Sequence, residues 1–201
     1  MKTRYSALDI QKKYRPIISV FGSSTCEPQS PLYELSYKIG KILSSHGLTI
    51  ANGGYTGTMD AISKGASENR GEIIGITTDE IVAVSPSPYL TQEFREESLY
   101  SRLDLISNIA DLFLFLPGST GTLTELSLIL DRQKLGLINP VKPMILYGKT
   151  WENIFLIMFG PSSDPLVPKS KWKKDNEVEA MTFCVLSLEE LQDRLAKITS
   201  R

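Results

Sequence analysis

The chain has 201 residues, 41% of them hydrophobic, a size and composition that suit one globular domain with a full core. Its formal net charge of −1 argues against nucleic-acid binding by bulk electrostatics, and the short basic run at residues 169–174 is interpreted as a solvated loop. No apolar stretch is long enough to span a bilayer, and no signal peptide is evident, so we expect a cytoplasmic protein without membrane partners. Two cysteines and one histidine argue against a disulfide framework and a zinc site. We therefore expect neither a bound metal nor, given the net charge, a nucleic-acid partner.

Strand-like and helix-like segments alternate from Pro16 onward, which is typical of a parallel sheet wrapped by helices. The predicted strands are residues 17–21, 48–51, 73–77, 112–116, 144–147 and 182–186. The predicted helices are residues 31–46, 58–69, 98–109, 122–135, 151–159 and a final one after Ser187, with loops at 85–88 and 160–168. The interpretation is a polar N-terminal extension (1–15) followed by a single α/β domain (16–201). That domain is a doubly wound parallel sheet with helices on both faces.

Polar residues at helix starts predict how several helices begin. Ser30 is a typical N-cap, and Ser187 with Glu190 fits a capping box, in which two side chains satisfy free backbone N–H groups. Thr58 and Asp60 open the second predicted helix and are interpreted as caps, not catalysts.

Three loops rich in small residues follow the carboxyl ends of predicted strands: the first loop (residues 22–25), the second loop (52–57) and the third loop (117–122). In doubly wound sheets, ligands bind beyond the carboxyl ends of the strands. None of the loops has the dinucleotide spacing or the Gly-Lys-Ser/Thr of a nucleotide triphosphatase, so we expect a pocket for a phosphorylated ligand of another kind. The candidate ligand-binding residues are Gly22, Ser23, Ser24, Gly53, Gly54, Thr58, Gly118, Ser119, Thr120, Gly121 and Thr122.

The third loop joins a buried strand to a helix start, where consecutive backbone N–H groups can hold an anion such as phosphate. Glu125 lies three residues beyond Thr122, so its carboxylate is on the same helical face and overlooks that spot. A purely structural interpretation has about equal weight, because Thr122-x-x-Glu125 also fits a capping box and an acidic residue near a helix start is favoured by the macrodipole.

These motifs resemble those of the LOG (Lonely Guy) proteins. Residues 117–125 (PGSTGTLTE) are similar to the PGGxGTxxE signature of that family, and residues 52–59 (NGGYTGTM) to its GGGxxGLM loop. Residues 21–24 are similar to its first-strand turn, and Arg102 falls where the family places its active-site arginine. The match in order and spacing extends over residues 17–143, most of the chain.

The resemblance implies a Rossmann-like fold, a homodimer, and hydrolysis of the N-glycosidic bond of a nucleoside 5'-monophosphate, such as a cytokinin riboside monophosphate or an AMP-like nucleotide. It implies that Arg102 and Glu125 are catalytic and that no metal or cofactor takes part. The apolar residues of the long helix are candidates for the dimer interface, although such residues more often form the core: Leu123, Leu126, Ile129 and Leu130.

The sequence also departs from the family pattern. Asn52 and Ser119 replace glycines of the two motifs, Leu103 replaces the usual lysine after the arginine, and Thr124 stands where many of the hydrolases have a second acidic residue. These changes keep open a second function, a non-catalytic carrier of a phosphorylated ligand that resembles molybdenum-cofactor carriers. Retention of both Arg102 and Glu125 favours the enzyme.

Overall fold

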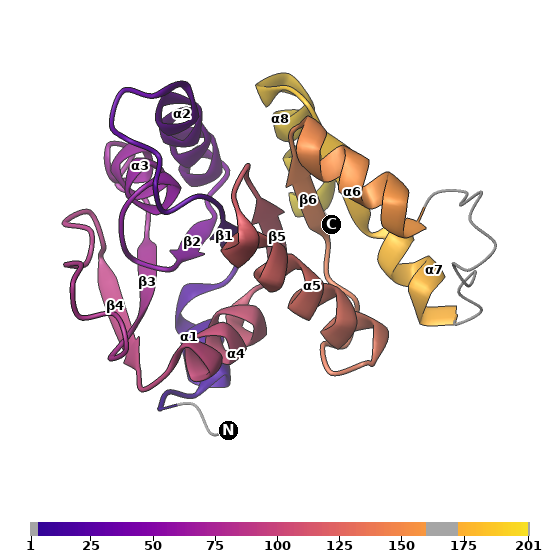
Figure 1. Cartoon of the computed structure of the whole chain (residues 1–201), viewed down its shortest axis with the longest axis horizontal. Coiled ribbons are helices and arrows are strands. Elements are labelled where there is room, and N and C mark those ends of the chain that lie inside the picture. Colours follow the sequence, from indigo (N-terminus) through magenta and orange to yellow (C-terminus); the bar gives the residue numbers. More distant parts are fainter. Residues whose placement is uncertain (1–3, 160–172, 201) are drawn as a thin grey trace.

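The structure is a computed structural model in which residues 4–159 and 173–200 are described. At its centre lies a seven-stranded sheet with the order β4-β3-β2-β1-β5-β6-β7, in which every neighbouring pair is parallel (Figure 1). The strands are β1 (Ile17–Phe21), β2 (Thr49–Asn52), β3 (Ile73–Thr78), β4 (Gln92–Glu96), β5 (Leu112–Phe115), β6 (Met144–Tyr147) and β7 (Thr182–Val185). The predicted α/β fold is confirmed.

Helices cover both faces of the sheet (Figure 1). They are α1 (Ala7–Tyr14), α2 (Pro31–Ser45), α3 (Thr58–Ser67), α4 (Leu99–Ile109), α5 (Thr120–Lys134), α6 (Lys149–Phe159), α7 (Lys173–Ala180) and α8 (Leu188–Thr199). One buried apolar cluster includes residues of α1, α4 and α5, and the other includes residues of α2, α3 and α8. In β5, Phe113 and Phe115 belong to the first cluster, whereas Leu112 and Leu114 belong to the second. Strands with both faces covered need continuous apolar runs, which is what the sequence has.

The strand order places a topological switch point between β1 and β5. From β1 the chain moves outward through β2 and β3 to β4, and α4 then carries it back to β5 on the other side of β1. Ile18 of β1 accordingly has Ile50 of β2 as its neighbour on one side and Leu112 of β5 on the other. The loops after β1 and β5 therefore leave the sheet in opposite directions and flank the crevice where such folds bind ligands.

The N-terminal residues contribute more than a polar extension. Residues 7–14 form α1, whose start is capped by the Ser6 hydroxyl, which accepts a hydrogen bond from the N–H of Asp9. Ile10 is only 4% exposed and belongs to the core on the α4 face. The short length and high charge of this segment left no apolar period that would have predicted a helix.

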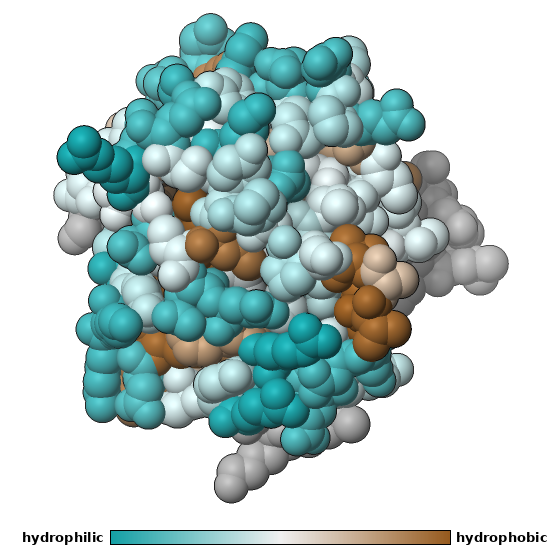
Figure 2. Space-filling model, turned by 90° about the vertical axis from the view of Figure 1, so that its left-hand side faces the viewer, coloured by the Kyte–Doolittle hydropathy of each residue, from teal (hydrophilic) through white to brown (hydrophobic). Residues whose placement is uncertain are grey.

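The edge strand β4 was also missed. Its sequence, Gln-Glu-Phe-Arg-Glu, has a single apolar residue, because an edge strand needs to bury little. The face of the molecule at this end of the sheet is mainly hydrophilic, with separate apolar patches (Figure 2).

Helix α7 was not predicted from the sequence either. The predicted loop at 160–168 lies outside the described residues, as does most of the basic run at 169–174. Among the described helices, none has the length and apolarity needed to cross a membrane.

Candidate functional site

The three small-residue loops meet at the carboxyl edge of the sheet, as predicted. The first loop is bonded to the third, since the N–H of Ser23 donates to the carbonyl of Pro117 at 3.2 Å. It is bonded to the start of α3 as well, since the N–H of Thr58 donates to the carbonyl of Ser23 at 2.8 Å. Gly57 permits this approach: its φ is +72°, and a Cβ there would lie 2.3 Å from the carbonyl oxygen of Ser23.

A cavity of about 420 Å³ opens where these loops meet, within the usual range for small-molecule sites. The predicted residues that line it are Gly22, Ser24, Gly53, Arg102, Ser119, Gly121, Thr122 and Glu125. Five other predicted residues do not line this cavity within the described part of the chain: Ser23, Gly54, Thr58, Gly118 and Thr120. The cavity thus contains both residues that the resemblance implies are catalytic, together with part of each small-residue loop.

Two of the predicted residues outside the lining hold the loops in place. Thr58 is 1% exposed, and its hydroxyl donates to the carbonyl of Ser23 at 3.0 Å. The N–H of Gly54 donates to the side-chain oxygen of Asn52 at 2.8 Å. Asn52 is fully buried, and its amide nitrogen donates to the hydroxyl of Ser63 in α3. The asparagine that replaces a motif glycine therefore fastens the second loop to α3 and does not reach the cavity.

The start of α5 differs from the capping-box interpretation. The helix begins at Thr120 with Ser119 as N-cap, and no side chain caps it. Glu125 is therefore too far along the helix to close its start, and the structural explanation for this residue is wrong. Within the described residues, the N–H groups of Thr120, Gly121 and Thr122 donate to no protein acceptor. Free donors at a helix start, with the positive end of the macrodipole behind them, form an anion-binding site.

The predicted caps of α3 are wrong for a similar reason. Gly57 is the N-cap and makes no side-chain capping bond. Asp60 instead accepts hydrogen bonds from the hydroxyls of Tyr33 (2.6 Å) and Ser87 (2.7 Å). It thereby joins α2, α3 and the loop between β3 and β4 beside the cavity.

Electrostatics single out Glu125. Its carboxylate has no hydrogen bond or ion pair with any residue that the structure describes. Burial raises its pKa to about 7, and the positive charge of Arg102 opposes that rise only in part. Burial also lowers the pKa of Arg102, whereas Glu125 acts to raise it. A carboxylate with a raised pKa in a cavity is a candidate for acid–base or electrostatic catalysis.

The apolar walls of the cavity were not predicted as part of the site. Tyr55 lies within the second loop, Met59 lies in the first turn of α3, and Ile81 and Val84 come from the segment between β3 and β4. Side chains of this kind are usual in ligand pockets. The motifs carry no signal for Ile81 and Val84, because that segment reaches the cavity only through the folding of the sheet.

In the described residues, no group of three or more histidine, cysteine, aspartate or glutamate side chains could hold a metal ion. The lining of the cavity offers a small ligand the turn at the start of α5, with its free N–H groups, and the side chains of Arg102 and Glu125.

Comparison with known proteins identifies the family. A family model described as the SLOG cluster4 family matches residues 15–153, and the chain belongs to this family. The match covers β1 to β6 and so includes all three loops, Arg102 and Glu125. The predicted membership among LOG-like proteins is confirmed.

Two curated relatives are named cytokinin riboside 5'-monophosphate phosphoribohydrolase. The one from Rhodococcoides fascians is 27% identical over 56% of this chain and 58% of its own length. The one from Mycobacterium marinum is 28% identical over 53% of this chain and 58% of its own length. The similarity thus spans a little over half the length of each of these relatives.

Solved structures share the fold over a longer stretch. A molybdenum cofactor carrier protein from Chlamydomonas reinhardtii has a TM-score of 0.70 at 17% identity, covering 92% of this chain and 99% of that one. A molybdenum cofactor binding protein from Rippkaea orientalis has a TM-score of 0.67 at 21% identity, covering 91% and 96%. At such identities the likeness is one of fold.

Proposed function

We propose that this protein hydrolyses the N-glycosidic bond of a nucleoside 5'-monophosphate, such as a cytokinin riboside monophosphate or an AMP-like nucleotide, and releases a free base and ribose 5-phosphate. The observation that carries the proposal is the position of Glu125 in the cavity. Its carboxylate lines the cavity, has no structural partner among the described residues, and is subject to the charge of Arg102. The names of the two bacterial relatives support the same reaction class.

The 5'-phosphate is assigned to the start of α5. Ser119, Gly121 and Thr122 line the cavity there, and the free N–H groups of this turn can donate to phosphate oxygens without any lysine. Gly22 and Ser24 of the first loop line the same cavity. The serine in place of a motif glycine keeps its backbone N–H, so the substitution at Ser119 is compatible with this role.

The chemistry follows from the charge that develops on the sugar. As the C1'–N bond breaks, its electron pair leaves with the base nitrogen and the ribose becomes oxocarbenium-like, as in other glycosidic cleavages. The carboxylate of Glu125 stabilises this positive charge. Water then forms the new O–C1' bond and loses a proton, which a carboxylate with a pKa of about 7 can accept, while the base nitrogen gains a proton. Arg102 orients the substrate and keeps part of the Glu125 population ionised at neutral pH.

The second candidate function is a carrier that binds a phosphorylated ligand without turning it over. This alternative is supported by the fold that the chain shares with the two molybdenum-cofactor proteins over nine-tenths of its length. The same anion-binding start of α5 would hold the phosphate of such a ligand. In that case Glu125 would have no chemical task, and its replacement would leave the function unchanged.

Incubation with a panel of nucleoside 5'-monophosphates separates the two functions, with free base and ribose 5-phosphate measured by chromatography. We expect wild-type protein and an Asp131→Asn variant to release base, and Glu125→Gln to release very little. Asp131 is the matched control, because it is an exposed carboxylate on the same helix and lies outside the cavity. Binding of the monophosphates without release of base by the wild type would favour the carrier.

We also propose a homodimer, on the basis of the resemblance. The long-helix face offered for it needs revision, since Leu126, Ile129 and Leu130 are buried in the core of their own chain. Leu123 alone of the four is exposed, at 40%. Sedimentation at micromolar concentration tests the proposal, and a monomer there would refute it.

A further inference from the structure

The guanidinium of Arg102 is held on three sides, although the residue lies in the first turn of α4. Its Nε donates to the carbonyl of Ile76 in β3 at 2.7 Å. Its Cζ lies 5.7 Å from the centre of the Tyr55 ring, within the range of a cation–π contact. On the third side is Gly53, where a Cβ would be 1.8 Å from a guanidinium nitrogen. Only glycine at position 53 leaves room for this arrangement.

The ring of Tyr55 is itself fixed. Its side chain is buried, and its hydroxyl donates to the carbonyl of Thr78 at 3.2 Å and accepts from the N–H of the same residue at 3.0 Å. Two bonds to one backbone position define the place of the ring relative to the end of β3. The surface on which the guanidinium lies is therefore attached to the same strand that supplies the Ile76 carbonyl.

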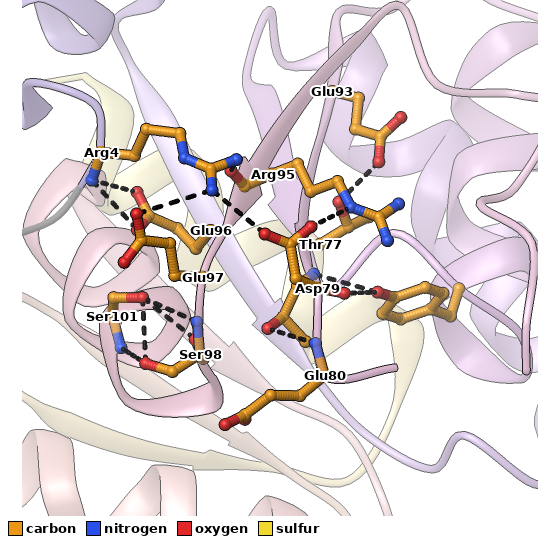
Figure 3. A network of polar contacts seen from close by, with 12 residues as sticks. Arg4, Thr77, Asp79, Glu80, Glu93, Arg95, Glu96, Glu97, Ser98 and Ser101 are labelled. Atoms are coloured by element: carbon orange, nitrogen blue, oxygen red, sulfur yellow. Dashed lines mark hydrogen bonds and ion pairs between the residues drawn. The ribbon is translucent and has the colours of Figure 1, made fainter. Parts of the chain in front are cut away.

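The end of β3 is anchored in turn by charged residues. Asp79, the next residue after the strand, forms ion pairs with Arg95 at 2.6 Å and Arg4 at 3.1 Å (Figure 3). The carboxylate of Glu80 accepts from the N–H of Leu99, which ties this segment to the start of α4. Both the Tyr55 ring and α4, the helix that carries Arg102, are thus attached by hydrogen bonds to the carboxyl end of β3 or to the residues that follow it.

We propose that Tyr55 is a positioning residue: its ring, fixed by the two hydrogen bonds of its hydroxyl, keeps the guanidinium of Arg102 where the positive charge of Arg102 acts on Glu125. The consequence for catalysis rests on the proposed function, whereas the positioning of the charge does not. Tyr55 makes its contribution through Arg102 and takes no part in bond making or breaking.

Glu125 reports on the position of Arg102. Among the cavity-lining residues in the described part of the chain, these two carry the charges, and Arg102 is the charged group that acts on Glu125. Burial raises the pKa of Glu125 to about 7, and Arg102 limits that rise. If the guanidinium moves away, Glu125 keeps its proton to higher pH. An opposite charge within a few ångströms shifts a carboxyl pKa by about one to three units, so the change is measurable.

The test is an NMR titration of the Glu125 carboxyl carbon in ligand-free protein labelled with ¹³C-glutamate, with Glu125→Gln to assign the signal. We expect Tyr55→Leu and Gly53→Ala, which disturb the guanidinium from different sides, each to raise the pKa of Glu125 by about one unit. Tyr55→Phe, which keeps the ring but loses the hydroxyl, should have a smaller effect. Tyr147→Leu is the control, because Tyr147 is similarly buried but lies on β6 outside the cavity.

An unchanged Glu125 titration in folded Tyr55→Leu overturns the proposal. If that variant does not fold, unchanged titrations in both Tyr55→Phe and Gly53→Ala overturn it. If the wild type releases base, the rise of kcat/KM with pH should move in parallel with the NMR value. A wild type that releases no base refutes the enzymatic function, while the titration still decides whether Tyr55 positions Arg102.

Discussion

In α8, the hydroxyl of Ser187 accepts a hydrogen bond from the N–H of Glu190, and the Glu190 carboxylate accepts one from the N–H of Leu186 at 2.7 Å. In α5, the same Ser/Thr-x-x-Glu pattern occurs at Thr122 and Glu125, but the helix has already begun two residues earlier. The first pattern closes a helix start. The second leaves the start open and places its carboxylate in a cavity.

The difference teaches that a capping pattern is defined by where the helix begins. Helices α1, α2 and α4 begin, like α8, with a serine whose hydroxyl accepts a backbone N–H. Helices α3 and α5 have no such cap, and both begin at the loops that form the cavity. At α3 the first N–H, that of Thr58, donates to the carbonyl of Ser23, whereas the first three N–H groups of α5 have no protein acceptor among the described residues. Free N–H groups are costly unless water or a ligand satisfies them, so the open start of α5 is consistent with a site for an anion.

The largest expected effect separates the two glutamates by activity. If the proposed function holds, Glu125→Gln should lower kcat by about a hundredfold or more, the scale for loss of one electrostatic stabiliser. Glu190→Gln should leave kcat unchanged, because that carboxylate binds only the start of α8. Release of base from a nucleoside monophosphate is the measurement. An active Glu125→Gln protein would end the catalytic assignment and favour the carrier.

A second difference concerns stability and pH. The pKa of Glu125 is raised to about 7 in the folded protein, above its value in the unfolded chain, so the folded state holds the proton more tightly. The wild type should therefore lose stability as pH rises from about 4.5 to 7 and carry the full penalty above that range. Glu125→Gln has no such penalty.

Urea unfolding gives the free energy of unfolding of both proteins at pH 8 and at pH 4.5. We expect the value for Glu125→Gln minus the value for wild type to be about 2 kcal/mol larger at pH 8 than at pH 4.5. Partial exposure of the side chain keeps this below the full value for a buried group. A stability difference that is the same at both pH values would show that the folded protein does not raise this pKa.

The sequence predicted most of the fold because the buried strands are continuous apolar runs between clear helix boundaries. It missed α1 and β4, which lie at the periphery and bury one face of few residues. In the site, the spacing from Thr122 placed Glu125 beside the third loop, whereas Arg102 was found only through the resemblance to the LOG proteins. It could not show whether Glu125 closes a helix, since two positions of the helix start fit the same residues. Ile81 and Val84 were beyond reach, because only the three-dimensional path of their segment brings them to the cavity.

Removal of the α8 cap tests the other side of the comparison. Ser187→Ala removes the acceptor for the N–H of Glu190 and should cost about 1 kcal/mol of folding stability, the usual loss for a serine N-cap. Activity should remain, because α8 contributes no residue to the cavity lining in the described chain. Urea unfolding of both proteins gives the value. No loss of stability would mean that this cap is not formed in solution.

The smallest effect is expected at the corresponding position of α5. Ser119 is the N-cap residue, but its hydroxyl makes no capping bond and the side chain is exposed. Ser119→Ala should therefore cost only a few tenths of a kcal/mol, well below the usual loss for an N-cap serine. The backbone N–H groups of the turn are unchanged, so binding of AMP measured by calorimetry should be retained within a few-fold. A loss of stability as large as that of Ser187→Ala would show that the Ser119 hydroxyl caps α5 after all. The start of that helix would then be closed without a ligand, and the contrast between the two helices would no longer support an anion site.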